Sequence, residues 1–177
     1  MRLIRVTHMG ERRPRKLGLR EDWASIPFLL IVCIGWVVAG YDFWMLQDLR
    51  FQLNALSATG VILLLIGGAL RLTSRRTLMK AGFGLLNSSR LQIVENQSLV
   101  TDGIYRHIRH PLYLGEIARN IGIPLILSSV YGFAIVFIGN LFLLLRIPIE
   151  ERMLVEEFGQ EYEEYMKKTK KLIPFVY

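Results

Sequence analysis

One stretch of the sequence places basic, aromatic and helix-initiating residues side by side. It reads Arg109-His110-Pro111-Leu112-Tyr113. Pro111 suits the first turn of a helix, because the N–H group that proline lacks would have no partner there. The free N–H groups and positive dipole end of such a helix, together with His110, predict a site for an anionic or polar cofactor. A histidine before a helix is also commonly a cap or a surface residue, so this block alone does not identify a cofactor.

Two pairs of ionisable residues lie in or beside apolar stretches, where an isolated charge is costly. Glu116 and Arg119 are three residues apart. Arg146 and Glu150 are four residues apart, so the members of each pair can meet on one helix face. Each pair is either a structural ion pair or a set of groups that face a ligand. Pro148 favours a ligand-facing role for the second pair, because a proline inside a helix bends the axis and frees a backbone carbonyl.

The elements that must position these residues are long and apolar. The 177-residue chain is 52% hydrophobic, with a mean hydropathy of +0.34, which excludes a disordered chain. A helix crosses the hydrocarbon layer of a membrane with about 20 mostly apolar residues. The sequence therefore predicts an all-α integral membrane protein with about four transmembrane helices, at residues 23–45, 53–72, 112–129 and 131–149. The last two predicted spans follow each other so closely that we expect a tight helical hairpin.

Positive charge is concentrated on one side of the predicted spans. Lys and Arg number 22 against 15 Asp and Glu, a net charge of +7. Basic residues crowd the segment 1–22 and the segment between the second and third spans, whereas the first hairpin loop has only Arg50. Since cytoplasmic flanks are enriched in Lys and Arg, we expect both termini and the middle segment to be cytoplasmic. Residues 23–177 then form a single membrane domain.

The same charge has a simple explanation in the anionic inner leaflet of the membrane. The basic stretches contain no aromatic stacking clusters or helix-turn-helix signals, so we expect membrane lipids and no nucleic acid as partners. Cys33 is the single cysteine and lies in an apolar run, which excludes a disulfide within the chain and a thiolate cluster for a metal. We expect no metal site, and we expect Cys33 to be a core residue.

Apolar residues recur at spacings of three and four after the fourth span, opposite a strongly acidic face. This pattern predicts an amphipathic C-terminal helix that packs on the protein's own cytoplasmic segment. That segment is the one in which a cofactor-binding site is expected. Gly159 is a point where this helix could break. The apolar positions are Leu154, Phe158, Tyr162, Tyr165 and Met166.

Taken together, these blocks resemble the isoprenylcysteine carboxyl methyltransferase family, within the larger group that includes the phospholipid methyltransferases. The resemblance covers nearly half of the chain, from about residue 91 to residue 175, and its parts have the right order and spacing. The first two spans match only as generic apolar helices. The residues that carry the resemblance are Leu99-Val100-Thr101-Asp102-Gly103-Ile104-Tyr105, Arg109-His110-Pro111-Leu112-Tyr113, Arg146 with Glu150-Glu151, Phe158-Gly159-Gln160-Glu161-Tyr162 and Ile173-Pro174-Phe175.

The resemblance implies methyl transfer from S-adenosylmethionine to a lipophilic small-molecule or lipidated acceptor at the cytoplasmic membrane face. It implies that Glu150 holds the amino-acid end of this cofactor and that Arg146 faces the acceptor. A carboxylate acceptor is already nucleophilic and needs only orientation, for which the planar guanidinium is suited. A thiol or ammonium acceptor would need a base, for which Glu116 is the candidate. The residues implied to line the cofactor are Gln97, Ser98, Leu99, Val100, Tyr105, His110, Pro111, Leu112 and Tyr113.

Two other functions stay open from the sequence. A membrane reductase of the sterol type resembles this group in its C-terminal half but uses NADPH, and the chain has no evident basic cluster for a 2′-phosphate. A non-catalytic membrane scaffold or sensor would retain the fold without turnover. The presence of His110, Arg146 and Glu150 disfavours this second alternative.

Overall fold

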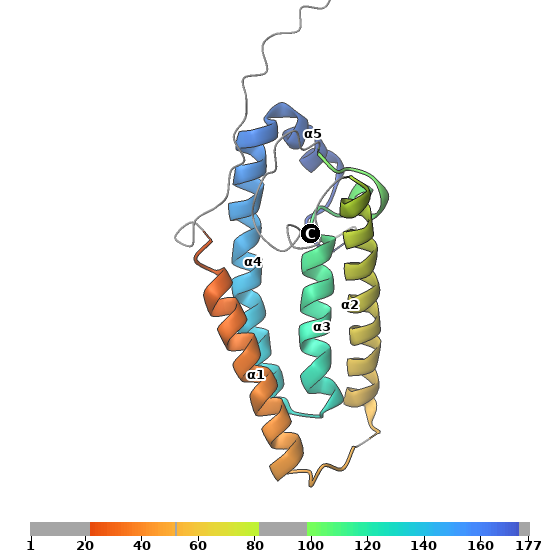
Figure 1. Cartoon of the computed structure of the whole chain (residues 1–177), viewed down its shortest axis with the longest axis vertical. Helices are drawn as coiled ribbons and strands as arrows, with labels where there is room; N and C mark the ends of the chain where they lie inside the picture. The colour runs from red at the N-terminus through yellow and green to blue at the C-terminus, as the bar shows by residue number, and fades with distance from the viewer. Residues whose placement is uncertain (1–21, 52, 82–98, 174–177) are drawn as a thin grey trace, which may run out of the picture.

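The structure is a computed structural model that describes residues 22–51, 53–81 and 99–173. Over these ranges the chain is helical, as predicted. In Figure 1 the helices α1, α2, α3 and α4 alternate in direction, so that α2 and α4 end, and α3 begins, near the short helix α5. We call this end of the bundle the α5 end. The helices are α1 (Ser25–Met45), α2 (Ala55–Lys80), the 3-10 helix η2 (Gly103–Arg106), α3 (Pro111–Ile126), α4 (Val130–Phe158) and α5 (Gln160–Lys168).

Three of these helices are long and apolar enough to cross a membrane, namely α1, α2 and α4. They correspond to the first, second and fourth predicted spans. The third predicted span, 112–129, is the 16-residue helix α3, which is about 24 Å long at a rise of about 1.5 Å per residue. It is thus shorter than the hydrocarbon layer of about 30 Å.

Two helices extend well beyond the spans that the sequence predicts. α2 continues from residue 72 to Lys80, and α4 continues through Pro148 to Phe158. Hydropathy marks where a helix leaves the apolar layer, but a helix continues into water until its backbone meets a breaking residue. In α4 the breaking residue is Gly159, which lies between α4 and α5. Its φ angle of +55° lies in a backbone region that favours glycine.

The bundle consists of two tight helix pairs, α2 with α3 and α1 with α4 (Figure 1). In the first pair, Gly60 and Gly67 of α2 lie against Gly122 and Gly115 of α3. A Cβ atom added at Gly60 would lie 2.5 Å from the Ile126 amide nitrogen, and one at Gly67 would lie 2.6 Å from the Gly115 carbonyl oxygen. The helix backbones are therefore in direct contact, as small residues allow between membrane helices.

In the second pair, glycines of α4 likewise lie directly against α1. A Cβ atom at Gly132 of α4 would lie 2.6 Å from the Cβ of Ala39 in α1, and one at Gly139 would lie 2.8 Å from the Val32 side chain. Glycine and alanine thus allow close contact in this pair as well.

Large apolar side chains cover the outside of the helices instead. They include Leu29, Leu30, Ile34 and Val37 of α1, Leu65 and Ile66 of α2, and Phe137, Ile138 and Leu141 of α4. Cys33 is also exposed, so our expectation that it lies in the core is wrong. A face that contacts lipid is as apolar as a protein interior, so hydropathy alone could not assign this residue.

Side-chain hydrogen bonds tie the connection between α3 and α4 to α1 and to the segment that follows α1, at the end of the bundle opposite α5. Only residues 127–129 separate α3 from α4, so the connection is as short as the sequence predicts. The two helices do not form a tight pair, because α3 packs mainly on α2 and α4 packs mainly on α1. Ser129 caps α4 by accepting from the Gly132 N–H at 2.9 Å, and its hydroxyl donates to the buried Asp42 carboxylate at 2.5 Å. The Gln47 side-chain amide donates to the Leu127 carbonyl at 2.9 Å.

Candidate functional site

The loop before α3 is held at the α5 end by the segment that follows α5. The Arg109 N–H donates to the Lys170 carbonyl at 2.8 Å, and the His110 N–H donates to the Lys171 carbonyl at 3.0 Å. Ile108 and Lys170 form an isolated parallel β-bridge. These backbone bonds fix the position of His110 at the start of α3. They join residues about 60 apart in the chain, and the sequence pattern did not predict them.

Arg109 connects three elements at the α5 end. Its Nε atom pairs with Glu151 Oε1 at 2.8 Å, and its Nη1 atom donates to the carbonyl oxygens of Met166 at 3.0 Å and Thr169 at 2.5 Å. Only 7% of the Arg109 side chain is exposed. No role for Arg109 was predicted from the sequence, although the basic pair at 109–110 and the acidic pair at 150–151 were a signal that the two dipeptides meet.

His110 lies between two carboxylates and an aromatic ring. Its Nδ1 atom is 3.6 Å from Glu150 Oε2, and its Nε2 atom is 3.3 Å from Glu151 Oε1. The imidazole is stacked on the Tyr113 ring, with 5.5 Å between the ring centroids and 7° between the planes. His110 is buried, whereas the Glu150 side chain is 26% exposed. Glu150 therefore retains an accessible carboxylate that could bind a cationic group.

Arg146 pairs with Asp22, and not with Glu150. Its Nε atom donates to Asp22 Oδ1 at 2.8 Å, and its Nη2 atom donates to Asp22 Oδ2 at 2.7 Å. The guanidinium carbon also lies 5.8 Å from the Tyr113 ring centroid, at cation–π distance. Arg146 and Glu150 share a helix turn and a neighbour in Tyr113, but they have different charged partners. Asp22 lies 124 residues away from Arg146 in the chain, so the sequence pattern did not predict it as a partner.

Three buried tyrosines surround this cluster from η2 and α5. The Tyr165 hydroxyl donates to the Tyr105 carbonyl at 2.6 Å. Burial raises the pKa of Tyr105 and Tyr162 well above the usual value of about 10, and the nearby Glu150 carboxylate raises both further. These phenols are therefore neutral hydrogen-bond donors. The Tyr162 side chain is only 1% exposed, and its hydroxyl has no hydrogen-bond partner among the residues that the structure describes.

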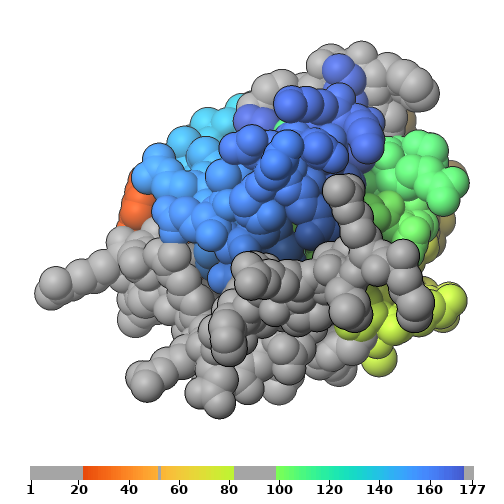
Figure 2. Space-filling model, turned by 90° about the horizontal axis from the view of Figure 1, so that it is seen from above, coloured from red at the N-terminus to blue at the C-terminus, as the bar shows by residue number. Residues whose placement is uncertain are grey.

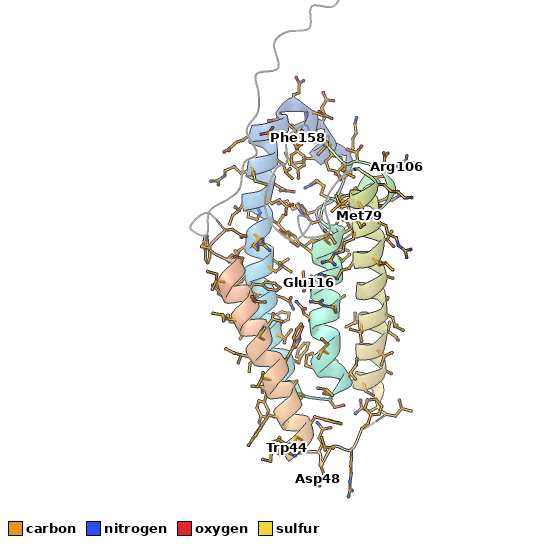
Figure 3. The ribbon with its side chains drawn as sticks, viewed as in Figure 1. Trp44, Asp48, Met79, Arg106, Glu116 and Phe158 are labelled. Carbon is orange, nitrogen blue, oxygen red and sulfur yellow. The ribbon has the colours of Figure 1, made fainter. Side chains whose placement is uncertain are left out.

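Glu116 belongs to a separate cluster. It pairs with Arg119 and also with Arg71 of α2, which the sequence analysis did not predict. The Arg119 guanidinium lies 5.6 Å from the Trp36 ring centroid. In Figure 3, Glu116 lies part-way along the bundle, away from Arg106 and Phe158 at the α5 end. It is six residues beyond His110, a rise of about 9 Å along α3.

Of the remaining residues predicted to line the cofactor, the structure describes four and leaves two outside its described ranges. Leu99 and Val100 are half-buried, without regular structure, and Gln97 and Ser98 lie outside the described residues. Pro111 is buried at the first position of α3, and Leu112 is half-buried. Figure 2 shows the α5 end, where the blue surface of α4 and α5 lies beside the green surface of the segment before α3.

The expected free N–H groups at the start of α3 are mostly used within the protein. Pro111 has no N–H group, and the Tyr113 and Leu114 N–H groups donate to the His110 carbonyl at 3.1 and 3.2 Å. Of the two kinds of cofactor expected at this helix end, anionic or polar, the geometry favours a polar one. The side chains nearby are two carboxylates, an imidazole and phenol rings, which suit a ligand with a cationic part.

Long apolar helices with small residues at their contacts and large apolar side chains outside define an integral membrane protein. At the α5 end of that bundle lies a cluster of buried polar and aromatic groups. The chain belongs to the phospholipid methyltransferase family, whose model matches residues 56–161, from α2 to the start of α5.

Individual relatives point to one branch of this group. The chain is similar to a probable protein-S-isoprenylcysteine O-methyltransferase of Oryza sativa subsp. indica, with 32% identity over 68% of this chain and 62% of that protein. It is also similar to the protein-S-isoprenylcysteine O-methyltransferases of Xenopus laevis, with 30% identity over 97% of this chain and 58% of that protein, and of Homo sapiens, with 29% identity over 84% and 54%. The chain thus spans little more than half the length of these relatives.

A solved structure has the same fold. It is the eukaryotic intramembrane Ras methyltransferase named isoprenylcysteine carboxyl methyltransferase. The two chains superimpose with a TM-score of 0.65 and 30% sequence identity, over 84% of this chain and 52% of the other.

Proposed function

We propose that this chain transfers a methyl group from S-adenosylmethionine to the carboxylate of a lipophilic acceptor of the prenylcysteine type. The observation that carries the proposal is the separation of Arg146 from Glu150. These two charged groups lie one helix turn apart beside Tyr113, yet each has its own partner. Glu150 would then serve the cofactor, and Arg146 would serve the acceptor once the Asp22 side chain moves aside. The similarity to prenylcysteine methyltransferases supports the same assignment.

The donor set around Glu150 fits the cofactor. S-adenosylmethionine supplies an electrophilic methyl group on a sulfonium, and its amino-acid end carries an ammonium. The partly exposed Glu150 carboxylate would hold this ammonium through a charge-assisted hydrogen bond. The neutral tyrosine rings and the His110–Tyr113 stack would contact its flat and cationic parts. Gln97, Ser98, Leu99, Val100, Pro111 and Leu112 would complete the site.

The acceptor requires orientation more than activation. A carboxylate is ionised at neutral pH, and Arg146 would hold it through two parallel N–H···O bonds. Placing the carboxylate oxygen in line with the methyl group makes the reaction one between already oriented partners, which raises the rate of methyl transfer. Exclusion of water from the site raises this rate further. Glu116 would serve as a base only for a thiol or an amine acceptor.

The membrane orientation follows from the charge distribution and the helix directions. We infer that the α5 end faces the cytoplasm, with both termini on that side. The short helix α3 would be a fourth span whose Glu116 and Arg119 are satisfied by each other and by Arg71. α5 would be an amphipathic helix that packs on the protein's own cytoplasmic segment, with Tyr162 and Tyr165 turned inward and Glu161, Glu163 and Glu164 turned to water.

Titration of the purified chain with S-adenosylhomocysteine tests the cofactor site. Glu150→Gln should weaken binding about 10- to 150-fold, because a charge-assisted hydrogen bond is worth about 1.5–3 kcal/mol. The matched control is Glu163→Gln on the exposed face of α5, which should leave the affinity unchanged. Unchanged affinity in Glu150→Gln would contradict the assignment of this residue, and binding of NADPH in place of S-adenosylhomocysteine would favour a reductase.

A further inference from the structure

The Asp22 carboxylate is held by Arg146 in the same way as a carboxylate ligand would be. Both carboxylate oxygens accept a hydrogen bond, from Nε at 2.8 Å and from Nη2 at 2.7 Å. This two-pronged contact is the geometry in which a guanidinium recognises a carboxylate most strongly. Arg146 is 7% exposed, so the pair is largely shielded from water.

The backbone of Asp22 is fixed by the start of α1. Its carbonyl accepts hydrogen bonds from the Ser25 N–H at 3.2 Å and from the Ser25 hydroxyl at 2.8 Å. The Trp23 ring next to it packs edge-on against Phe142 of α4, with 6.3 Å between the centroids. The carboxylate therefore reaches Arg146 from an anchored position, and only its side chain needs to rotate to release the guanidinium.

The occupied edge of Arg146 is the one that carries Nε and Nη2. The Tyr113 ring lies beside the same guanidinium. A second carboxylate that approached this edge would meet the negative charge of Asp22, and like charges at close range repel. An uncharged group of the same shape would not be repelled.

We propose that Asp22 is a specificity-determining residue of the acceptor site, occupying the edge of Arg146 that an acceptor carboxylate would use. This inference rests on the proposed function, in which Arg146 orients the acceptor. A carboxylate acceptor must displace the Asp22 side chain, so its affinity is lowered by the competition within the chain. Asp22 thereby reduces the preference of the site for acids over neutral analogues.

A purely structural role for Asp22 leads to the opposite result. If Asp22 only holds Arg146 in place, its removal frees the guanidinium to move and weakens the binding of every acceptor that Arg146 contacts. The direction of the change in affinity therefore separates the two roles.

The test is direct binding of a prenylated cysteine with a free α-carboxylate and of its α-carboxamide to the purified full chain. Asp22→Asn should raise the affinity for the acid about tenfold, because it removes a charge-assisted contact that competes for Arg146. The affinity for the carboxamide should stay within about twofold. Asp22→Glu retains the competing charge and should behave like the unmodified chain.

Asp42→Asn is the matched control, since Asp42 is a buried aspartate near the other end of α1, bound to Ser129. It should change the affinity for neither analogue. In the unmodified chain, the acid and the carboxamide should bind with similar affinity, which can be measured even if Asp22→Asn does not fold. A preference of the unmodified chain for the acid of more than about tenfold, or a loss of acid affinity in Asp22→Asn, would overturn the inference.

Methyl transfer to the same acid is measured in parallel to separate this inference from the proposed function. Tighter acid binding in Asp22→Asn without methyl transfer by any variant would refute the function and retain the role of Asp22. Methyl transfer with unchanged or weaker acid binding in Asp22→Asn would refute the role of Asp22 and retain the function. Absence of acid binding in both proteins would refute both.

Discussion

The hydroxyl groups of Tyr162 and Tyr165 lie in the same short helix but have different surroundings. The Tyr165 hydroxyl donates to the Tyr105 carbonyl at 2.6 Å. The Tyr162 side chain is buried within the described part of the chain without a partner for its hydroxyl oxygen. A buried polar group without a partner is costly, whereas a satisfied one stabilises the fold.

We therefore expect opposite effects from two matched substitutions. Tyr165→Phe should lower the free energy of unfolding by about 1 kcal/mol, the usual value of a neutral hydrogen bond. Tyr162→Phe should leave it unchanged or raise it by up to about 1 kcal/mol, because it removes an unsatisfied group. Thermal unfolding of both variants in detergent checks this, and a larger loss in Tyr162→Phe than in Tyr165→Phe would contradict it.

Charge pairing at the residue scale depends on which helix ends lie close together. From their spacing, Arg146 and Glu150 could have paired with each other. In the structure, Arg146 binds Asp22 and Glu150 lies near His110. A test for a structural ion pair must therefore pair Arg146 with Asp22, and the segment before α1 becomes part of the site.

At the scale of elements, the closeness of α2 and α3 depends on glycines that face the partner helix. Gly67 and Gly68 are neighbours in α2 but point in different directions. A Cβ atom at Gly67 would lie within 2.7 Å of two backbone atoms of α3, whereas a Cβ atom at Gly68 would have nothing within 4 Å. Backbone atoms cannot move aside as a flexible side chain would, so only the first position is constrained.

Substituting each glycine by alanine separates packing from helix propensity. Gly67→Ala should lower the free energy of unfolding by about 1–3 kcal/mol, the usual cost of overpacking a close contact. Gly68→Ala should not lower it, because alanine is a better helix former than glycine. Equal destabilisation of the two variants, measured by thermal unfolding in detergent, would show that α2 and α3 are not in backbone contact.

At the scale of the whole molecule, the surface of the bundle is apolar on the outside of α1, α2 and α4. Side chains such as Val37 and Leu65, which are 71% and 66% exposed, face outward. Exposed apolar side chains along three long helices are unfavourable in water but suit contact with lipid. Trp44 and Asp48 lie at the end opposite Arg106 and Phe158 (Figure 3), so the two ends of the bundle would face opposite sides of a membrane.

Labelling of single cysteines tests this orientation. After Cys33 is replaced by alanine, cysteines at the exposed positions Arg50 and Val130 should react with an impermeant reagent from outside intact cells. Cysteines at Lys80 and Lys170 should react only after permeabilisation, because the basic α5 end should face the cytoplasm. Reaction at Lys80 in intact cells would reverse the orientation and move the proposed cofactor site to the other side.

The sequence by itself determined the helical class, the positions of the long apolar helices and the two blocks, around His110 and around Glu150, that carry the family resemblance. These properties depend on local composition, periodicity and spacing, which are present in the chain before it folds. Only the tertiary structure decided that α2 pairs with α3, that Cys33 faces outward and that Arg146 binds Asp22. A lipid-facing surface and a protein interior are equally apolar, so hydropathy does not distinguish the faces of a membrane helix. The partner of a charge depends on which distant helix ends meet, and that contact exists only after the bundle has packed.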